Sequence, residues 1–251
     1  MQHFFVNSEQ IDPAQGIISI DGPDAGHIGF SLRMACGEKI LVTDRNTSTR
    51  YECTLTQIQP QLVLCHIEEI QDSVAEPPYQ VTLFQALPKA DKMEWIIQKS
   101  VECGVSAIVP FASSRCIVKL DREKGKQKTE RWNKISLEAA KQCKRGIVPP
   151  VLDVHSFDQA RMRLQENSFD LILICYENEG TCTFKQALDA WKKKDLRLAL
   201  VIGPEGGFSL QEVEMMQTQN AKSVSLGNRI LRTETAPIVA LSYLSFLYEL
   251  T

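Results

Sequence analysis

Two short apolar runs near the C-terminal end of this chain each stop abruptly in a loop that contains glycine. The first run covers residues 196–202 and stops in Gly-Pro-Glu-Gly-Gly at 203–207, and the second covers residues 223–226 and stops in residues 227–236. Apolar runs of this length between turn residues are typical of buried strands. Because backbone without Cβ atoms can approach a ligand closely, two such strand ends in an α/β sheet predict a binding site for a small cofactor.

The composition of these loops excludes the common phosphate cradles. Residues 203–207 contain no lysine followed by serine or threonine, so they do not form a P-loop. They also lack the G-x-G-x-x-G spacing of dinucleotide-binding loops, and Pro204 removes one NH that a pyrophosphate would use. A neutral or cationic ligand held by backbone groups fits better. The alternative is that both loops are ordinary strand-to-helix turns.

The chain divides into two parts at the proline pair 77–78. Before it, alternating and β-branched runs predict short strands that close into a small barrel, among them residues 39–43, 50–57 and 61–67. After it, apolar strands alternate with helical patterns, which predicts an α/β fold with a parallel sheet. The strands are expected at residues 81–87, 107–111, 171–176 and 198–202, and the helices at residues 92–103, 129–144, 209–219 and 236–250.

The motifs of this framework are similar to those of one known family. They are Ile-Gly-Pro-Glu-Gly-Gly-Phe-Ser at 202–209, Leu-Gly at 226–227, Arg-Ile-Leu-Arg-Thr-Glu-Thr-Ala at 229–236, Gln-Ala-Leu-Pro-Lys at 85–89, and Glu-Ala-Ala at 138–140 with Gln142 and Arg145. The resemblance covers nearly the whole chain. They resemble the SPOUT class of S-adenosylmethionine-dependent RNA methyltransferases, and within it the bacterial small-subunit rRNA uridine N3-methyltransferases.

This resemblance implies a domain organisation and an activity. A PUA-like β-barrel RNA-binding domain is expected at residues 1–74, followed at residues 75–251 by a SPOUT methyltransferase domain with a parallel sheet and a C-terminal trefoil knot. The expected reaction is methylation of N3 of one uridine in small-subunit (16S) ribosomal RNA, either free or in the assembled small ribosomal subunit, by a homodimer. A methyltransferase of another RNA position and a non-catalytic RNA-binding assembly factor with the same fold are the alternatives.

The resemblance also names the cofactor and the residues that bind it. It implies that S-adenosyl-L-methionine lies between the two glycine-bearing loops, held by Ile202, Gly203, Pro204, Gly206, Gly207, Leu226, Gly227, Ile230, Leu231 and Thr235.

Methyl transfer from a sulfonium to uridine limits what the protein must supply. It needs no metal and no covalent enzyme intermediate, but uridine N3 is a poor nucleophile while it is protonated. A cation that stabilises the developing uridine anion is therefore expected, and Arg232 and Arg145 are the candidates. Glu234 and Glu205 are candidate bases, or groups that orient these arginines. A structural salt bridge is the alternative for each of the four.

The charge of the chain is unevenly distributed. The formal net charge is -3, yet residues 115–145 carry eleven basic and four acidic side chains, whereas residues 1–76 carry four basic and eleven acidic ones. A local basic stretch can hold the phosphates of RNA, and the alternative is a solvated loop and helix face. The predicted RNA contacts are Arg33, Lys89, Lys119, Lys124, Lys126, Lys128, Arg131 and Gln142.

The remaining features exclude several other classes of protein. The eight cysteines never form a C-x-x-C pair and the four histidines have no recognisable partners, so we expect reduced, buried thiols and no metal. No signal peptide and no window of about 18 apolar residues is visible, which predicts a cytoplasmic protein without a membrane span. The tryptophans at 95, 132 and 191 are expected in the core, although Trp132 lies where it can stack on a base. The apolar last helix is either a core helix or part of a dimer interface.

Overall fold

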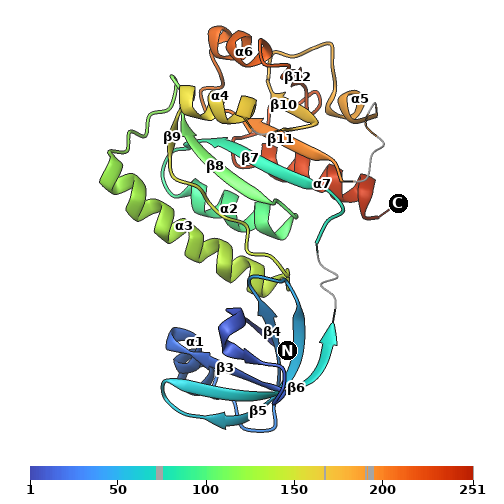
Figure 1. Ribbon diagram of the computed structural model, residues 1–251. Helices are drawn as coiled ribbons and strands as arrows, with labels where there is room; N and C mark the ends of the chain where they lie inside the picture. Colours follow the sequence, from blue (N-terminus) through green and yellow to red (C-terminus); the bar gives the residue numbers. More distant parts are fainter. Residues whose placement is uncertain (72–75, 167, 190, 192–194, 251) are drawn as a thin grey trace. The chain divides into compact units, whose positions relative to one another are not determined.

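The structure, a computed structural model, describes residues 1–71, 76–166, 168–189, 191 and 195–250 (Figure 1). The chain forms two compact units, of which the first comprises Met1–Glu76 and Ala140–Val148 and the second Pro77–Ala139 and Pro149–Thr251. The predicted domain boundary between residues 74 and 75 lies outside the described residues.

The first unit is built on a curled six-stranded sheet with the order β1-β4-β5-β6-β3-β2 (Figure 1). Its strands are β1 (Gln2–Val6), β2 (Ile11–Asp12), β3 (Ile17–Asp21), β4 (Lys39–Asp44), β5 (Arg50–Ile58) and β6 (Leu62–Gln71). Neighbouring strands are antiparallel except β1 and β4, which are parallel. The three strands predicted by residue range are confirmed, and closure of the sheet into a barrel stays a prediction.

The alternating pattern of these strands buries one set of side chains together with two short helical segments, α1 (Gly22–Gly26) and η2 (His27–Ser31). The buried cluster includes Phe4, Ile18, Ile28, Ile40 and Leu55. Residues 140–148 belong to this unit. They are held by an ion pair of 2.8 Å between Lys141 Nζ and Asp24 Oδ1 and by a hydrogen bond that the Arg50 guanidinium donates to the Lys144 carbonyl.

The second unit contains a six-stranded parallel sheet with the order β12-β10-β11-β7-β8-β9. Its strands are β7 (Gln80–Ala86), β8 (Ala107–Ala112), β9 (His155–Ser156), β10 (Leu171–Cys175), β11 (Arg197–Ile202) and β12 (Lys222–Val224). The predicted α/β fold with a parallel sheet is confirmed. Strand β10, and β11 after Arg197, are apolar throughout because helices cover both of their faces.

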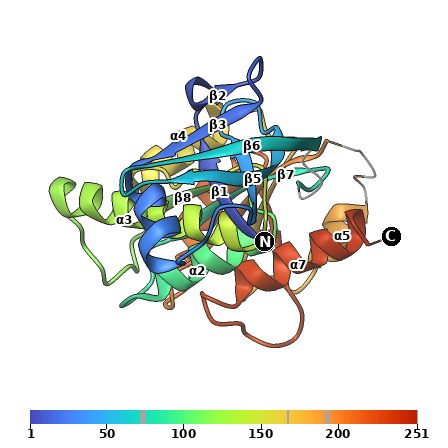
Figure 2. The same ribbon diagram turned by 90° about the horizontal axis from the view of Figure 1, so that it is seen from below.

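Two pairs of helices cover this sheet. Helices α2 (Lys92–Glu102) and α7 (Ala236–Tyr248) lie side by side on one face, as Figure 2 shows from below. Helices α4 (Phe157–Glu166) and α6 (Leu210–Gln217) pack on the other face, where Leu164 and Met216 meet Phe84 and Ile174 of the sheet. The predicted capping box of α6 is confirmed, since Ser209 Oγ accepts from Glu212 N and Glu212 Oε2 accepts from Ser209 N. A short helix, α5 (Phe184–Asp189), precedes β11.

Helix α3 (Arg122–Gln142) begins earlier than its pattern predicts. The expected range was 129–144, but Asp121 accepts the backbone NH groups of Lys124 and Gly125 and so provides an N-terminal cap. Most of the basic stretch is therefore helical. One face of the helix is buried, with Trp132, Ser136 and Ala140 among its members.

Two expectations about burial need correction. Trp95 is 43% exposed and is not a core anchor, because it lies on the outer side of α2. The cysteines were expected to be buried, but of the eight only Cys53 and Cys65 are buried and Cys36 is exposed. For α7 the sequence left open a core helix or part of a dimer interface, and in the single chain Phe246 of this helix is 59% exposed.

Candidate functional site

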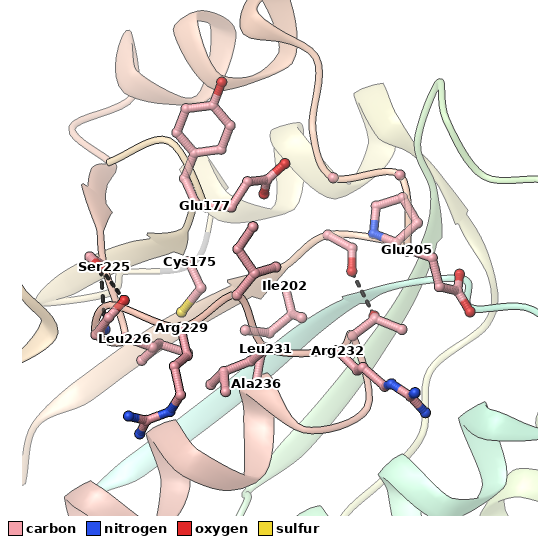
Figure 3. Close-up of a pocket in the computed structure, with 18 of the residues that line it drawn as sticks. Cys175, Glu177, Ile202, Glu205, Ser225, Leu226, Arg229, Leu231, Arg232 and Ala236 are labelled. Atoms are coloured by element: carbon pink, nitrogen blue, oxygen red, sulfur yellow. Dashed lines mark hydrogen bonds between the residues drawn. The ribbon is translucent and has the colours of Figure 1, made fainter. Parts of the chain in front are cut away.

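Three adjacent parallel strands of the second unit end beside one another and form a pocket. In the sheet, β10 lies between β11 and β12, so the loops that follow these strands meet at one edge. The pocket has a volume of about 510 Å³ and is lined by residues 175–177, 202–207 and 225–233, with Lys92 and Ala236 (Figure 3).

The pocket contains nearly all of the predicted cofactor-binding residues. The ones that line it are Ile202, Gly203, Pro204, Gly206, Gly207, Leu226, Gly227, Ile230 and Leu231. Thr235 is not among the lining residues that the structure describes. Its backbone NH donates to the Arg232 carbonyl at 2.8 Å, which closes the turn that leads into α7.

The first loop requires glycine at a specific position. Gly207 has φ +65, and its NH donates to the Pro204 carbonyl at 2.9 Å. A Cβ on Gly207 would lie 2.0 Å from Glu177 Oε1. Gly206 has no positive φ and is less constrained by its backbone, although a Cβ there would lie 3.3 Å from the Arg115 Cβ and would require that residue to shift. Gly207 is therefore the position where the backbone conformation favours glycine, and a side chain there would also require the flexible Glu177 carboxylate to move.

A buried hydrogen-bond chain connects the two loops. The Gln85 amide donates to Thr233 Oγ1 at 3.0 Å, and Thr233 Oγ1 donates to the Gly203 carbonyl at 2.7 Å. Gln85 and Thr233 are both buried. Since β7 supplies Gln85, the sheet itself holds the spacing between the loops.

An ion cluster lies beside the pocket. Lys92 Nζ is 3.0 Å from Glu205 Oε1 and 3.1 Å from Glu234 Oε2, and the backbone NH of Lys89 donates to Glu205 at 3.1 Å. Burial by itself raises the pKa of Glu205, but the hydrogen bonds from Lys92 and from backbone NH groups outweigh it and leave that pKa below its usual value. Glu205 is therefore a carboxylate already occupied by donors.

The four predicted catalytic side chains are distributed over both units. Arg232, Glu205 and Glu234 belong to the pocket region of the second unit. Arg145 belongs to the first unit, where its side chain is 4% exposed and its Nη2 lies 2.6 Å from Glu76 Oε2. This is the geometry of the structural salt bridge that the sequence left open for Arg145, and its catalytic role stays a prediction.

Arg232 and Arg229 are the pocket's exposed arginines. In Figure 3 both side chains extend to the side of the pocket that lies opposite Glu177. Neither has an ion pair within the part of the chain that the structure describes, so their guanidinium groups are available to a ligand.

The predicted RNA contacts differ in their surroundings. Lys128 and Arg131 face the start of α2, where they lie 4.0 Å from Asp91 and 2.8 Å from Glu94. Lys124 pairs with Asp121 at 3.4 Å. The exposed side chains for which the described residues offer no ion pair are Arg33, Lys89, Lys119, Lys126 and Gln142. Trp132 is 3% exposed, which makes it a core residue and not a stacking platform.

Sequence reasoning missed the pocket residues at the end of β10 and just after it, namely Cys175, Tyr176 and Glu177. Their strand was predicted, but nothing in the chain order shows that β10 inserts between β11 and β12. Burial raises the pKa of the Cys175 thiol, so this side chain is a neutral part of the pocket wall. Ser225, Asn228, Arg229 and Lys92 were also missed, although the first three flank the predicted glycine.

Among the described residues, no helix is both long and apolar enough to span a membrane. In the same part of the chain, no group of three or more histidine, cysteine, aspartate or glutamate side chains is placed to hold a metal ion.

Comparison with known proteins places this geometry in a family. A family model described as an RNA methyltransferase domain matches residues 75–245. The ribosomal RNA small subunit methyltransferase E of Bacillus subtilis (strain 168) is 40% identical over 255 residues, covering 100% of this chain and 98% of that protein. The protein of the same name from Aquifex aeolicus (strain VF5) is 33% identical and covers 77% of this chain and 80% of its own. A crystal structure of a ribosomal RNA small subunit methyltransferase E from Neisseria gonorrhoeae bound to S-adenosyl methionine has a TM-score of 0.83 at 28% identity, covering 99% of this chain and 98% of that chain.

Proposed function

This chain belongs to the ribosomal RNA small subunit methyltransferase E family, and we propose that it transfers a methyl group from S-adenosylmethionine to N3 of one uridine in small-subunit ribosomal RNA. The observation that carries this proposal is the pocket at the ends of β10, β11 and β12, in which two glycine-bearing loops are joined by the bonds from Gln85 to Thr233 and from Thr233 to Gly203.

The pocket fits S-adenosylmethionine in size and chemistry. A volume of about 510 Å³ is within the range of small-molecule sites. Gly227 has φ +118, and a Cβ on it would meet no protein atom within 4 Å, so the loop leaves open space where a side chain would otherwise stand. The Glu177 carboxylate, which has no ion pair among the described residues, and the arginines on the opposite side suit a ligand that carries both charges. S-adenosylmethionine supplies an activated methyl group on a sulfonium.

Arg232 is our candidate for the residue that stabilises the uridine anion. It lines the pocket, is exposed and has no ion pair among the described residues, so its planar fork is free to bind the base carbonyls. Glu205 and Glu234 share Lys92 as a partner, and they act in this proposal as structural anchors of the loops. Arg145 is the second candidate cation.

The RNA is proposed to be bound by the exposed basic side chains. On α3 and the segment before it, these include Lys119 and Lys126. On the first unit they include Arg33, whose φ of +52 is unusual for a residue with a side chain.

The first unit is proposed to be a PUA-like barrel, and the second is proposed to be a SPOUT domain with a C-terminal knot. The protein is proposed to act in the cytoplasm.

A homodimer is proposed from the surface of α7. Val239, Phe246 and Leu250 are 39%, 59% and 74% exposed, and together with Ser242 they recur every three or four residues along one side of this end of the chain. An exposed row of large apolar side chains of this kind, interrupted here by Ser242, is typical of an interaction surface.

The proposed function is tested by the RNA itself. Mass spectrometry of ribosomal RNA from cells with and without this protein should reveal one N3-methylated uridine in small-subunit RNA that disappears with the gene. Calorimetric titration of the purified protein should show binding of S-adenosylmethionine. A protein that binds RNA but neither binds the cofactor nor changes the methylation pattern would be an assembly factor, and the proposal would be wrong.

A further inference from the structure

Lys92 is a single cation that touches both loops of the pocket. It stands in the first turn of α2, with Nζ 3.0 Å from Glu205 Oε1 in the loop after β11 and 3.1 Å from Glu234 Oε2 in the loop after β12. Its side chain is 33% exposed, while those of Glu205 and Glu234 are 23% and 17% exposed. The two contacts are therefore partly shielded from water, which strengthens them relative to a surface ion pair.

The placement of this ammonium has an electrostatic consequence. Glu205 and Glu234 share one partner, and without it two like charges would lie close together at the pocket. The cation nearest to Glu234 in sequence that lines the same pocket is Arg232, which has no ion pair in the described structure. If the Lys92 ammonium were removed, the Arg232 guanidinium would be the pocket cation that neutralises the carboxylates of Glu205 and Glu234.

We propose that Lys92 is a positioning residue that fixes the two cofactor loops to α2 and, by occupying both carboxylates, keeps Arg232 free for the substrate. This role rests on the proposed function, because it assigns the free Arg232 to the reaction. It is distinct from the buried link through Gln85 and Thr233, which holds the loops through neutral hydrogen bonds.

The alternative is that Lys92 forms an ordinary surface ion pair, which contributes little. The chain offers a matched control for this alternative on the same helix. Lys99 Nζ lies 2.8 Å from Glu102 Oε2, and its side chain is 35% exposed, close to the exposure of Lys92. Lys99 is not among the residues that line the pocket.

The experiment compares Lys92→Met, Lys92→Arg, Lys99→Met and the triple variant Lys92→Met/Glu205→Gln/Glu234→Gln. Hydrogen exchange of the amides in residues 203–207 and 227–235 is measured first, in the protein without cofactor. Binding of S-adenosylmethionine and the single-turnover rate of methyl transfer to RNA are measured next, and thermal unfolding checks that each variant is folded.

Lys92→Met is expected to speed exchange in both loops and to lower cofactor affinity and methyl-transfer rate by about tenfold each, the scale of coupling between neighbouring charged groups. Lys92→Arg should keep loop exchange, cofactor affinity and methyl-transfer rate close to their wild-type values. Lys99→Met should leave all three unchanged. The triple variant, which removes the carboxylates that compete for Arg232, should recover much of the rate even if the loops stay mobile.

Two results would overturn the proposal: loop exchange in Lys92→Met that matches Lys99→Met, or a triple variant that is as slow as Lys92→Met. The exchange measurement involves neither cofactor nor RNA, so a failure of the proposed function is recognised separately, as a wild-type protein that neither binds S-adenosylmethionine nor methylates RNA.

Discussion

At the scale of single residues, the glycines of the first loop are not equivalent. Gly207 combines φ +65 with a Cβ position only 2.0 Å from Glu177 Oε1, whereas Gly206 has no positive φ and a Cβ there would require only a small shift of Arg115, whose Cβ is 3.3 Å away. We expect Gly207→Ala to lower the affinity for S-adenosylmethionine by at least about tenfold. An alanine at this positive φ strains the loop by about 1 kcal/mol or more, and its Cβ also displaces the Glu177 side chain. Gly206→Ala should lose less. Calorimetric titration of both variants checks this order, and equal affinities would contradict it.

Arg232 is the residue whose replacement separates chemistry from binding. If it stabilises the uridine anion, Arg232→Ala should reduce the single-turnover rate by about a hundredfold or more, the loss expected for one preorganised charge donor. The affinities for cofactor and RNA should change much less. Arg232→Lys should recover little, since a point charge does not reproduce a bidentate fork. Loss of RNA affinity with an unchanged saturated rate would make Arg232 a binding residue and leave Arg145 as the candidate.

At the scale of elements, α3 presents its basic residues in two different ways. Lys128 and Arg131 face acidic residues of the α2 region, while Lys126 and Lys134 are exposed without an ion pair in the described structure. We expect Lys126→Ala/Lys134→Ala to weaken RNA binding and to reduce the slope of log K against log salt by up to about 2.

The control for this prediction is Lys185→Ala on α5, an exposed lysine on a helix outside the basic stretch. It should leave the salt slope unchanged. Cofactor affinity should be the same in both variants. A double variant with the wild-type slope would show that this face of α3 is only a solvated surface.

Strand β1 carries a histidine whose titration is expected to affect stability. His3 is 5% exposed, and its Nε2 lies 2.8 Å from Thr43 Oγ1. Burial, assisted by repulsion from Arg50, lowers the pKa of His3 from 6.5 to about 4. Between pH 6.5 and about pH 4, the unfolded chain therefore binds a proton at His3 that the folded chain does not bind. The contribution of His3 to the free energy of unfolding is full above pH 6.5 and is lost as the pH falls towards 4, by an amount on the order of 3 kcal/mol. Urea denaturation across this pH range measures the free energy of unfolding. In His3→Gln this free energy should depend less steeply on pH than in the wild-type protein.

The elements also show what local patterns can predict. The capping box at Ser209 and Glu212 and the strands β7, β8, β10 and β11 follow from short-range rules, and the structure confirms them. The predicted start of α3 was wrong because a basic stretch that contains glycine is typical of a loop. In the structure, the N-terminal cap by Asp121 outweighs the loss of helix stability that Gly125 causes. The exposure of Trp95 depends on which side of α2 meets the sheet, a property of packing that its sequence does not show.

At the scale of the whole molecule, the pocket depends on strand order. The two glycine loops were predicted from sequence, but Cys175 and Glu177 enter the pocket only because β10 inserts between β11 and β12. Lys92 enters it because the first turn of α2 lies within ion-pair distance of both loops. The order of strands and the position of α2 are long-range properties that local sequence patterns do not show. The motif residues of the two loops were therefore predicted, whereas Cys175, Glu177 and Lys92 were not.

The surface of α7 gives the prediction that concerns the molecule as an assembly. Phe246 is 59% exposed within an apolar stripe, so exposing it to water in a monomer is unfavourable and covering it with a second copy is favourable. We expect the protein to be a dimer in solution and Phe246→Glu to convert it to a monomer, because a dimer interface would bury two unpaired carboxylates.

Light scattering coupled to size-exclusion chromatography measures this mass directly. The matched control is Phe30→Glu, since Phe30 is 67% exposed on η2 of the first unit and does not belong to the stripe. This control should stay dimeric, and circular dichroism should show that both variants are folded. If the wild-type protein elutes as a monomer, or if Phe246→Glu keeps the mass of a dimer, the stripe on α7 is not the interface and the proposed homodimer loses its structural support.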